Sequence, residues 1–334
     1  MKAKLPGDRA WNQRKWAPLI VGAVLAATLQ GCYVSPSSTG SFNRTLTVNG
    51  PVLLELISGA GAVQVRPGTS GEVHIHGDIR AHFWFGDDPQ RRVDELAANP
   101  PIEQHGNLIH VGGDRFRMHD VSINYTIEVP AETELHSTIG SGNADVRGIR
   151  GPVRLTAGSG RVTLEDVRED AEVASGSGRI QIRRIGGEVH AKNGSGSITL
   201  AEIHGDIRAS SGSGHITISE PGGRITARTG SGGVTVSGAA ADLRAQTGAG
   251  HVTIDGNPAR GSFWEVHTGA GGVTLQVPAN ASFRLHAHAR SGRVRTDLPI
   301  VLEEQSRRDL RARVGDGAAR LEVICGSGTI HIKS

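Results

Sequence analysis

Residues 194–214 read GSGSITLAEIHGDIRASSGSG, and they decide the fold because they contain one complete unit of an internal repeat and the start of the next. The triplet Gly-Ser-Gly or Gly-Ala-Gly recurs every eighteen residues, beginning at Gly140, Gly158, Gly176, Gly194, Gly212, Gly230 and Gly248. The following triplet, at Gly269, comes after twenty-one residues. Repetition at a fixed period is the sequence signature of a solenoid, in which each unit forms one coil.

Each unit also contains two pairs of apolar residues with one residue between the members of a pair. In the quoted unit the pairs are Ile198 with Leu200 and Ile207 with Ala209. This alternation is typical of strands with one buried face. The sequence therefore predicts an all-β fold, a parallel β-solenoid (β-helix) with about 18-residue coils. We expect right-handed winding, because parallel crossover connections are nearly always right-handed.

The repeat and its flanks divide the chain into five parts. A Pro/Ser/Gly-rich stretch, VSPSSTGS, predicts a tether, and Gly326-Ser-Gly328 restores the repeat near the end of the chain. The expected parts are a lipoprotein signal peptide (1–31), a flexible tether (32–44), an N-terminal β region (45–139) with a loop or helical excursion near 87–98, the regular solenoid (140–290), and a C-terminal insertion with a capping coil (291–334).

Composition and charge exclude several other classes of protein. The 334 residues include 47 Gly and only 2 Cys. No Gly-X-Y period is present, which excludes collagen, and two cysteines exclude a disulfide scaffold or a Cys-rich zinc module. The net charge of +3 belongs to the leader, because residues 32–334 alone carry a net charge of −1. Without a cationic stripe, no nucleic-acid partner is expected.

The leader predicts export and attachment to a membrane. A basic segment (2–15) precedes an apolar segment (19–29), which is too short for a membrane span of about 20 residues. The segment ends in Leu29-Gln30-Gly31-Cys32, which resembles the lipobox of bacterial lipoproteins. The resemblance implies acylation of Cys32 and a lipid-anchored protein of the cell envelope. Because Tyr33 is not the Asp that retains such proteins in the inner membrane, the outer membrane is favoured. An ordinary signal peptide with an incidental cysteine is the alternative.

The histidines and the second cysteine are residues of this sequence that could bind a metal or react. Among 15 His, the closest pairs are His74 with His76 and His286 with His288, and each pair would share one face of a strand. Two ligands need further partners to hold a metal, so these are weak candidates and we predict neither metal nor cofactor. Cys325 is expected to be a small buried residue rather than a reactive thiol.

Catalytic motifs are missing. The sequence has no G-x-S-x-G elbow, no H-E-x-x-H and no P-loop lysine. The outward positions of the second strand form a mixed series without an acidic or basic patch: Arg154, Glu172, His190, Arg208, Thr226 and Arg244. We therefore predict no catalytic residues. The alternative is a carbohydrate-active enzyme with His74 and His76, Glu103 or the 255–263 turn in a cleft. Trp264 is expected in the core, with sugar stacking as its alternative.

One outward row is uniform, and it is the candidate binding surface. Its members are Thr163, Gln181, Thr199, Thr217, Thr235, Thr253 and Thr274. The β-propensity of Thr and contacts between stacked hydroxyls explain such a row. The functional interpretation is a flat polar face that binds a glycan, a peptidoglycan strand or an envelope protein, because repetitive surfaces suit extended ligands.

Residues 45–334 resemble the putative adhesin family of bacterial domains of unknown function. The motifs that carry the resemblance are Ile123-Asn-Tyr-Thr-Ile-Glu-Val-Pro-Ala131, Thr138-Ile-Gly-Ser-Gly142 and the recurrent G-S-G-x-[VI]-x-[LIV] units. The resemblance implies a repetitive β-solenoid in an exported or envelope-associated protein, and it brings no catalytic residues. The predicted function is a non-catalytic, adhesin-like envelope lipoprotein, and the resemblance also allows a component of an envelope-stress sensor.

Overall fold

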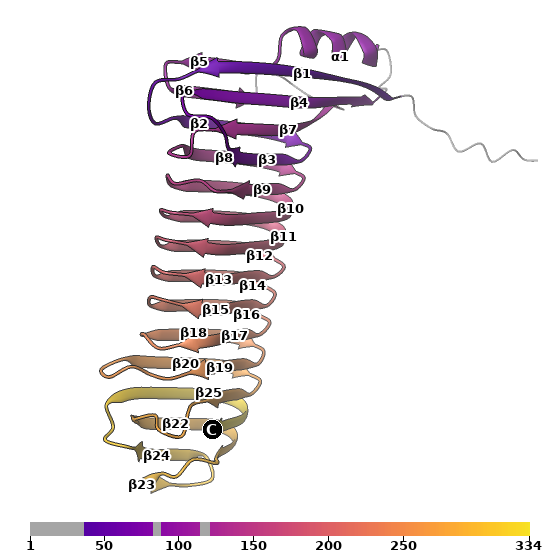
Figure 1. Cartoon of the computed structure of the whole chain (residues 1–334). Coiled ribbons are helices and arrows are strands. Elements are labelled where there is room, and N and C mark those ends of the chain that lie inside the picture. Colours follow the sequence, from indigo (N-terminus) through magenta and orange to yellow (C-terminus); the bar gives the residue numbers. More distant parts are fainter. Residues whose placement is uncertain (1–36, 83–87, 114–120) are drawn as a thin grey trace, which may run out of the picture. The chain divides into compact units, whose positions relative to one another are not determined.

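The computed structural model describes residues 37–82, 88–113 and 121–334, which form an all-β unit with a single short helix. The predicted signal peptide and Cys32 lie outside these residues. Within the described ranges, no helix has the length and apolar character needed to cross a membrane. Figure 1 shows the strands stacked one above another in a long series of coils.

Each regular coil has two extended segments that pair in parallel with their equivalents in the coils above and below, and in β10 and β11 the two segments form one continuous strand. In chain order these strands are β8 (Glu134–Ser141), β9 (Ala144–Arg147), β10 (Val153–Val167), β11 (Ala171–Ile185), β12 (Val189–Ser195), β13 (Ile198–Ile203), β14 (Ile207–Ser213), β15 (Ile216–Pro221), β16 (Ile225–Ser231), β17 (Val234–Ala239), β18 (Leu243–Ala249), β19 (Val252–Gly256), β20 (Phe263–Ala270) and β21 (Val273–Gln276).

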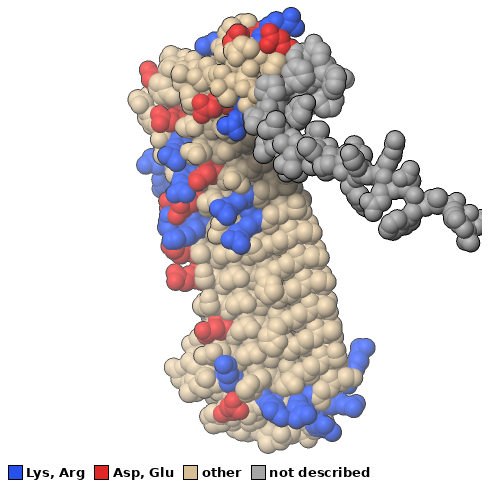
Figure 2. All heavy atoms as spheres, turned by 90° about the vertical axis from the view of Figure 1, so that its right-hand side faces the viewer, with Lys and Arg blue, Asp and Glu red and all other residues tan. Residues whose placement is uncertain are grey.

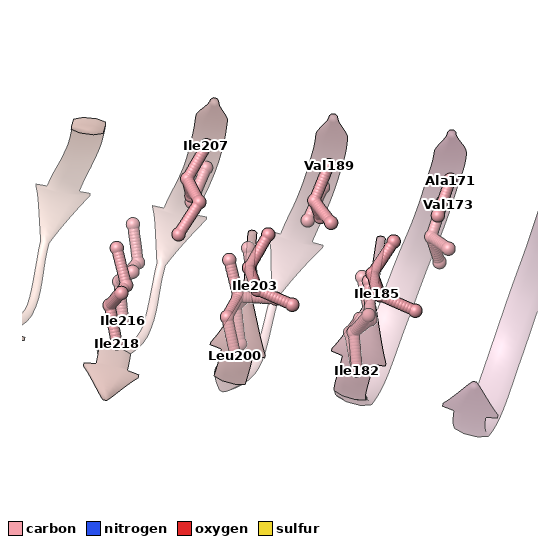
Figure 3. Packing of buried hydrophobic residues seen from close by; sticks show 14 of the residues in the cluster. Ala171, Val173, Ile182, Ile185, Val189, Leu200, Ile203, Ile207, Ile216 and Ile218 are labelled. Carbon is pink, nitrogen blue, oxygen red and sulfur yellow. The ribbon is translucent and has the colours of Figure 1, made fainter. Parts of the chain in front are cut away.

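Aliphatic side chains form continuous buried columns along the stack. Ile182 of β11 pairs with Leu200 of β13, which pairs with Ile218 of β15, so residues eighteen positions apart lie side by side. Figure 3 shows this column together with the parallel columns through Ile185 and Ile203 and through Val189 and Ile207. The predicted stacking is confirmed. A lone coil has no partner for its apolar side, so the stability of each coil comes from its neighbours.

Glycine is required at the corner between the two strands of a coil. Gly196 has a φ of +124°, a conformation that residues with a Cβ rarely adopt. A Cβ built at this position would also overlap the carbonyl oxygen of Gly178 in the preceding coil. The glycine at the third position of each triplet therefore lets successive backbones approach at the spacing of paired strands, about 4.8 Å.

A row of polar side chains lies inside the stack, next to these corners. The sequence pattern did not predict this inner row. Its buried members directly precede the glycine triplets: Ser175, Asn193, Ser211, Thr229, Thr247 and Thr268. Thr229 Oγ1 donates to the carbonyl oxygen of Gly214 at 3.1 Å, and Asn193 Nδ2 donates to that of Gly178 at 3.0 Å. The row thus supplies side-chain donors to these partly buried corner carbonyls.

Cys325 continues this inner row. Its Sγ lies 3.1 Å from the carbonyl oxygen of Gly271, and it is in register with Thr268. The side chain is fully buried, and burial raises the pKa of its thiol. The residue is buried as predicted from its apolar neighbours.

The N-terminal end of the stack is covered by an excursion of the chain. The first coil consists of β2 (Leu53–Ala60) and β3 (Val63–Pro67), which pair in parallel with β8 and β9. On their other side lie β6 (Leu108–Gly112) and β7 (Val121–Val129). Antiparallel pairing then adds β5 (Ile102–His105) to β6, β4 (Glu72–His82) to β7, and β1 (Ser37–Thr47) to β4. The expected excursion near 87–98 contains helix α1 (Pro89–Ala98).

The prediction of a flexible tether is wrong from Ser37 onward. All eleven residues of β1 pair with β4, and Phe42 is buried with its ring edge-on to that of Tyr125, at 6.3 Å between centroids. The small polar residues of this segment misled the sequence analysis, because an edge strand with one solvent-facing side needs few apolar residues.

The C-terminal end is also built out of chain order. The last strand, β25 (Ala319–Lys333), pairs in parallel with β20 and β21 on one side and with β22 (Phe283–Thr296) on the other. Antiparallel strands β24 (Asp309–Val314) and β23 (Val301–Gln305) follow β22. The coil around Gly326 is therefore not the cap that was predicted. Its alternating apolar residues fit between two coils, whereas the charged 284–313 segment covers the end.

Replacing a corner glycine tests the stacking constraint. We expect Gly196→Ala to lower the free energy of unfolding by at least about 2 kcal/mol, because Ala is strained at this φ and its methyl group overlaps Gly178. Urea unfolding followed by circular dichroism measures the change. Gly59→Ala is the matched control, since it starts an equivalent triplet but a Cβ there has no atom within 4 Å. Equal effects of the two substitutions would contradict the constraint.

Candidate binding surface

The structure assembles the predicted threonine row. Thr163, Gln181, Thr199, Thr217, Thr235, Thr253 and Thr274 are consecutive register partners on β10, β11, β13, β15, β17, β19 and β21. Each lies between two buried neighbours, as Thr199 does between Ile198 and Leu200, so the side chain points away from the core. Asp145 extends the row at one end and His331 at the other.

The surface around this row is uncharged over its middle coils. The segments that carry the row and its glycine corners contain no Lys, Arg, Asp or Glu in residues 195–200, 213–218, 231–236, 249–254 and 270–275. One side-chain contact joins the row to a corner, between His251 Nε2 and Thr274 Oγ1 at 3.1 Å. Figure 2 shows a side of the stack with a broad area free of charged side chains, and with charges gathered along its edge and at the ends.

The outer row of the other strand is charged, and its charges pair. The predicted series from Arg154 to Arg244 is in register. Arg154 Nε donates to Glu172 at 3.1 Å, which lowers the pKa of that carboxyl. Arg244 Nε donates to Glu265 at 2.7 Å. Exposed pairs of this kind contribute little to stability, and they leave no net patch for a polymeric anion or cation.

A second set of charges lies near the ends of β10, β11 and β13, one residue before each strand stops. Asp166, Arg184 and Glu202 all have positive φ and occupy equivalent positions in successive coils. Arg184 Nη2 donates to Asp166 at 3.0 Å and pairs with Glu165, and these contacts lower the pKa of Asp166. The sequence analysis missed the left-handed conformation, because these positions lack the glycine that normally signals it.

The four candidate histidines do not converge. His74 Nε2 lies 3.1 Å from Glu72, and His76 Nδ1 lies 2.8 Å from Asn43 Oδ1. Both belong to β4, whereas His286 and His288 belong to β22 at the opposite end of the stack.

The second histidine pair shares one carboxylate. His288 Nδ1 is 2.8 Å and His286 Nε2 is 3.7 Å from oxygens of Asp309. Among the described residues, no three His, Cys, Asp or Glu form a group that could hold a metal ion. Both histidine pairs are therefore partly exposed polar residues that contact carboxylate or amide groups.

The residues that would form the cleft of a carbohydrate-active enzyme are also separated from one another. Glu103 lies on β5 opposite His110, next to the N-terminal cap. The 255–263 turn precedes β20, and its last residues line a groove of about 610 Å³ beside β22 and β25 that contains neither His74 nor Glu103. Trp264 is fully buried and its Nε1 donates to the carbonyl oxygen of Ala241 at 2.8 Å, so it belongs to the core.

Comparison with known proteins finds similarity over part of the chain. A family model described as Toastrack DUF4097 matches residues 118–238. No curated protein sequence matches the chain. The match lies within the range over which the sequence resembles repetitive bacterial β-solenoids, and it covers the first regular coils.

Solved structures with similar arrangements share little sequence with this chain. A putative cell adhesion protein from Clostridium sporogenes has 11% identity and a TM-score of 0.23, covering 89% of this chain and 99% of that one. A putative lipid binding protein from Parabacteroides distasonis has 11% identity and a TM-score of 0.37, covering 87% and 96%. A putative adhesin from Bacteroides fragilis has 11% identity and a TM-score of 0.30, covering 88% and 97%.

Identical substitutions in the inner and outer rows separate structural from surface threonines. We expect Thr229→Val to lower the free energy of unfolding by about 1 kcal/mol, because the partly buried hydrogen bond to the carbonyl of Gly214 is lost. Thr217→Val, in the outer row, should change it by no more than about 0.5 kcal/mol. Denaturant midpoints of the two variants provide the comparison. A cost at Thr217 as large as that at Thr229 would show that the outer row is structural.

Proposed function

We propose that this protein is a non-catalytic, adhesin-like lipoprotein of the cell envelope whose β-solenoid presents an extended binding surface. The uncharged threonine row carries the proposal. It repeats one side chain at the spacing of parallel strands, over coils whose neighbouring corners have no charged residue. The face of the other strand instead carries ion pairs, such as Arg154 with Glu172 and Arg244 with Glu265.

The chemistry of the row suits an extended polar ligand. Threonine hydroxyls both donate and accept hydrogen bonds, and the register holds them in line without loops between them. A sugar polymer offers hydroxyl and amide groups along its length, so it can contact several coils at once. We therefore place a glycan or a peptidoglycan strand first among partners, with an envelope protein as the other option. We also propose right-handed winding of the 18-residue coils, the default for parallel crossovers.

Attachment to the membrane through Cys32 is part of the proposal. It rests on the basic and apolar segments of the leader and on Leu29-Gln30-Gly31-Cys32. Several acyl chains on one cysteine anchor a protein strongly, since each buried methylene contributes about 0.8 kcal/mol. Tyr33 in the following position favours the outer membrane by the same resemblance.

Metabolic labelling tests the anchor. Cells expressing the full-length chain and its Cys32→Ala variant are grown with a radioactive fatty acid, and the immunoprecipitated proteins are compared. We expect label in the wild type only. Cys325→Ala is the control and should retain the label, because that thiol is buried. Equal labelling of wild type and Cys32→Ala would remove the anchor from the proposal.

A sedimentation experiment tests the threonine row. The full-length chain in detergent micelles is mixed with purified peptidoglycan sacculi and centrifuged. We expect the wild type to sediment with the sacculi, and a triple variant (Thr199→Val, Thr217→Val, Thr235→Val) to bind at least tenfold more weakly, because it loses three hydroxyls but keeps the β-branched shape.

A double variant on the other outward face is the control. Thr156 and Thr226 lie on the face of β10 and β16 that bears the paired charges, and Thr156→Val with Thr226→Val should leave binding unchanged. Sedimentation of the triple variant at the wild-type level would exclude the row as the sugar-binding surface. Release of soluble fragments from the sacculi would instead support the enzymatic alternative.

A further inference from the structure

Positive charge is concentrated at the C-terminal end of the stack. Residues 284–334 contain ten Lys and Arg and six Asp and Glu, a net charge of +4, whereas residues 32–283 carry a net charge of −5. Figure 2 shows Lys and Arg gathered at this end, where Figure 1 places β22–β25. Charge of one sign gathered in one place attracts ligands of the opposite sign.

Three arginines of this end lie side by side across neighbouring strands. Arg284 of β22 is in register with Arg320 of β25 and with Arg313 of β24. Like charges directly opposite each other destabilise a sheet. Among the residues that the structure describes, no carboxylate forms an ion pair with Arg284 or Arg313, and the nearest to Arg320 is Glu322 at 3.8 Å. The row therefore holds positive charge that the protein does not neutralise.

The row borders the groove of about 610 Å³. Arg284 and Arg320 line the groove together with Arg311, His286 and Phe263. The guanidinium of Arg320 lies over the Phe263 ring, 5.4 Å from its centroid, which orients that side chain. The volume lies within the range of about 300–1,000 Å³ that is typical of sites for small ligands. One carboxylate, Glu303, lines the groove as well.

We propose that this groove binds an acidic saccharide, a sugar chain with one carboxylate on each ring, through Arg284 and Arg320, which line it, while Arg313 adds positive charge beside Arg284 in the row. A guanidinium binds a carboxylate with two parallel hydrogen bonds, which makes arginine the suited residue. The arginines are one strand apart, about 4.8 Å, a distance comparable to the length of a pyranose ring. Phe263 and His286 supply a flat apolar surface and a polar group beside the row. This site shares no residue with the threonine row, so each can fail without the other.

Calorimetry with a defined oligosaccharide tests the site. The full-length chain is titrated with tetragalacturonate at low salt, and we expect binding that weakens as salt is added. Arg284→Gln should weaken it at least tenfold, because the central guanidinium is lost. Arg228→Gln is the matched control and should leave it unchanged, since Arg228 is an exposed arginine of β16 in the middle of the stack.

Thermal unfolding separates a binding role from a structural one. Because the row is self-repelling, we expect Arg284→Gln to unfold at the same temperature as the wild type or above it. Affinity for tetragalacturonate that is equal in wild type and Arg284→Gln would overturn the proposal, as would the absence of binding. Equal affinity for neutral maltotetraose would show that the charges are not used. Equal affinity for tetraglutamate or inorganic phosphate would overturn the saccharide assignment.

Discussion

Parallel pairing of each coil with the next is the constraint on which the rest of this structure depends. It brings the corner backbones of successive coils so close that Gly196 could not carry a Cβ without overlapping Gly178. It also repeats every position at the strand spacing, so a column such as Ile182, Leu200 and Ile218 is buried along its whole length. Glycine corners and aliphatic columns are therefore two consequences of the same geometry.

The same geometry turns single positions into rows, and each row has one chemical character. The inner polar row supplies donors to corner carbonyls, as Thr229 does for Gly214. The outer charged rows neutralise themselves between neighbouring coils, as Arg154 and Glu172 do. The threonine row has neither task, which is why it remains available for a ligand. The binding that we propose would thus be a property of a row rather than of one residue.

The ends of the stack obey a different requirement, because a terminal coil has an uncovered side. At both ends this side is covered by strands whose order in the sheet differs from their order in the sequence. An excursion between β3 and β8 covers the first coil, and the hairpin of β23 and β24 lies beyond β22, while β25 returns into the stack. This return brings Arg320 beside Arg284 and forms the basic groove. The basic groove at this end is therefore a product of capping.

The sequence by itself determined the all-β class, the eighteen-residue spacing, the buried columns and the position of the threonine row, because each follows from local alternation repeated at a fixed period. Only the tertiary structure decided that Ser37–Thr47 is an edge strand, that β25 lies inside the stack, and that Arg284, Arg313 and Arg320 meet. These features depend on pairing between segments far apart in the chain, and pairing between distant segments has no period that the sequence could reveal. The separation of the two histidine pairs also depends on the tertiary structure, because the fold places β4 and β22 at opposite ends of the stack.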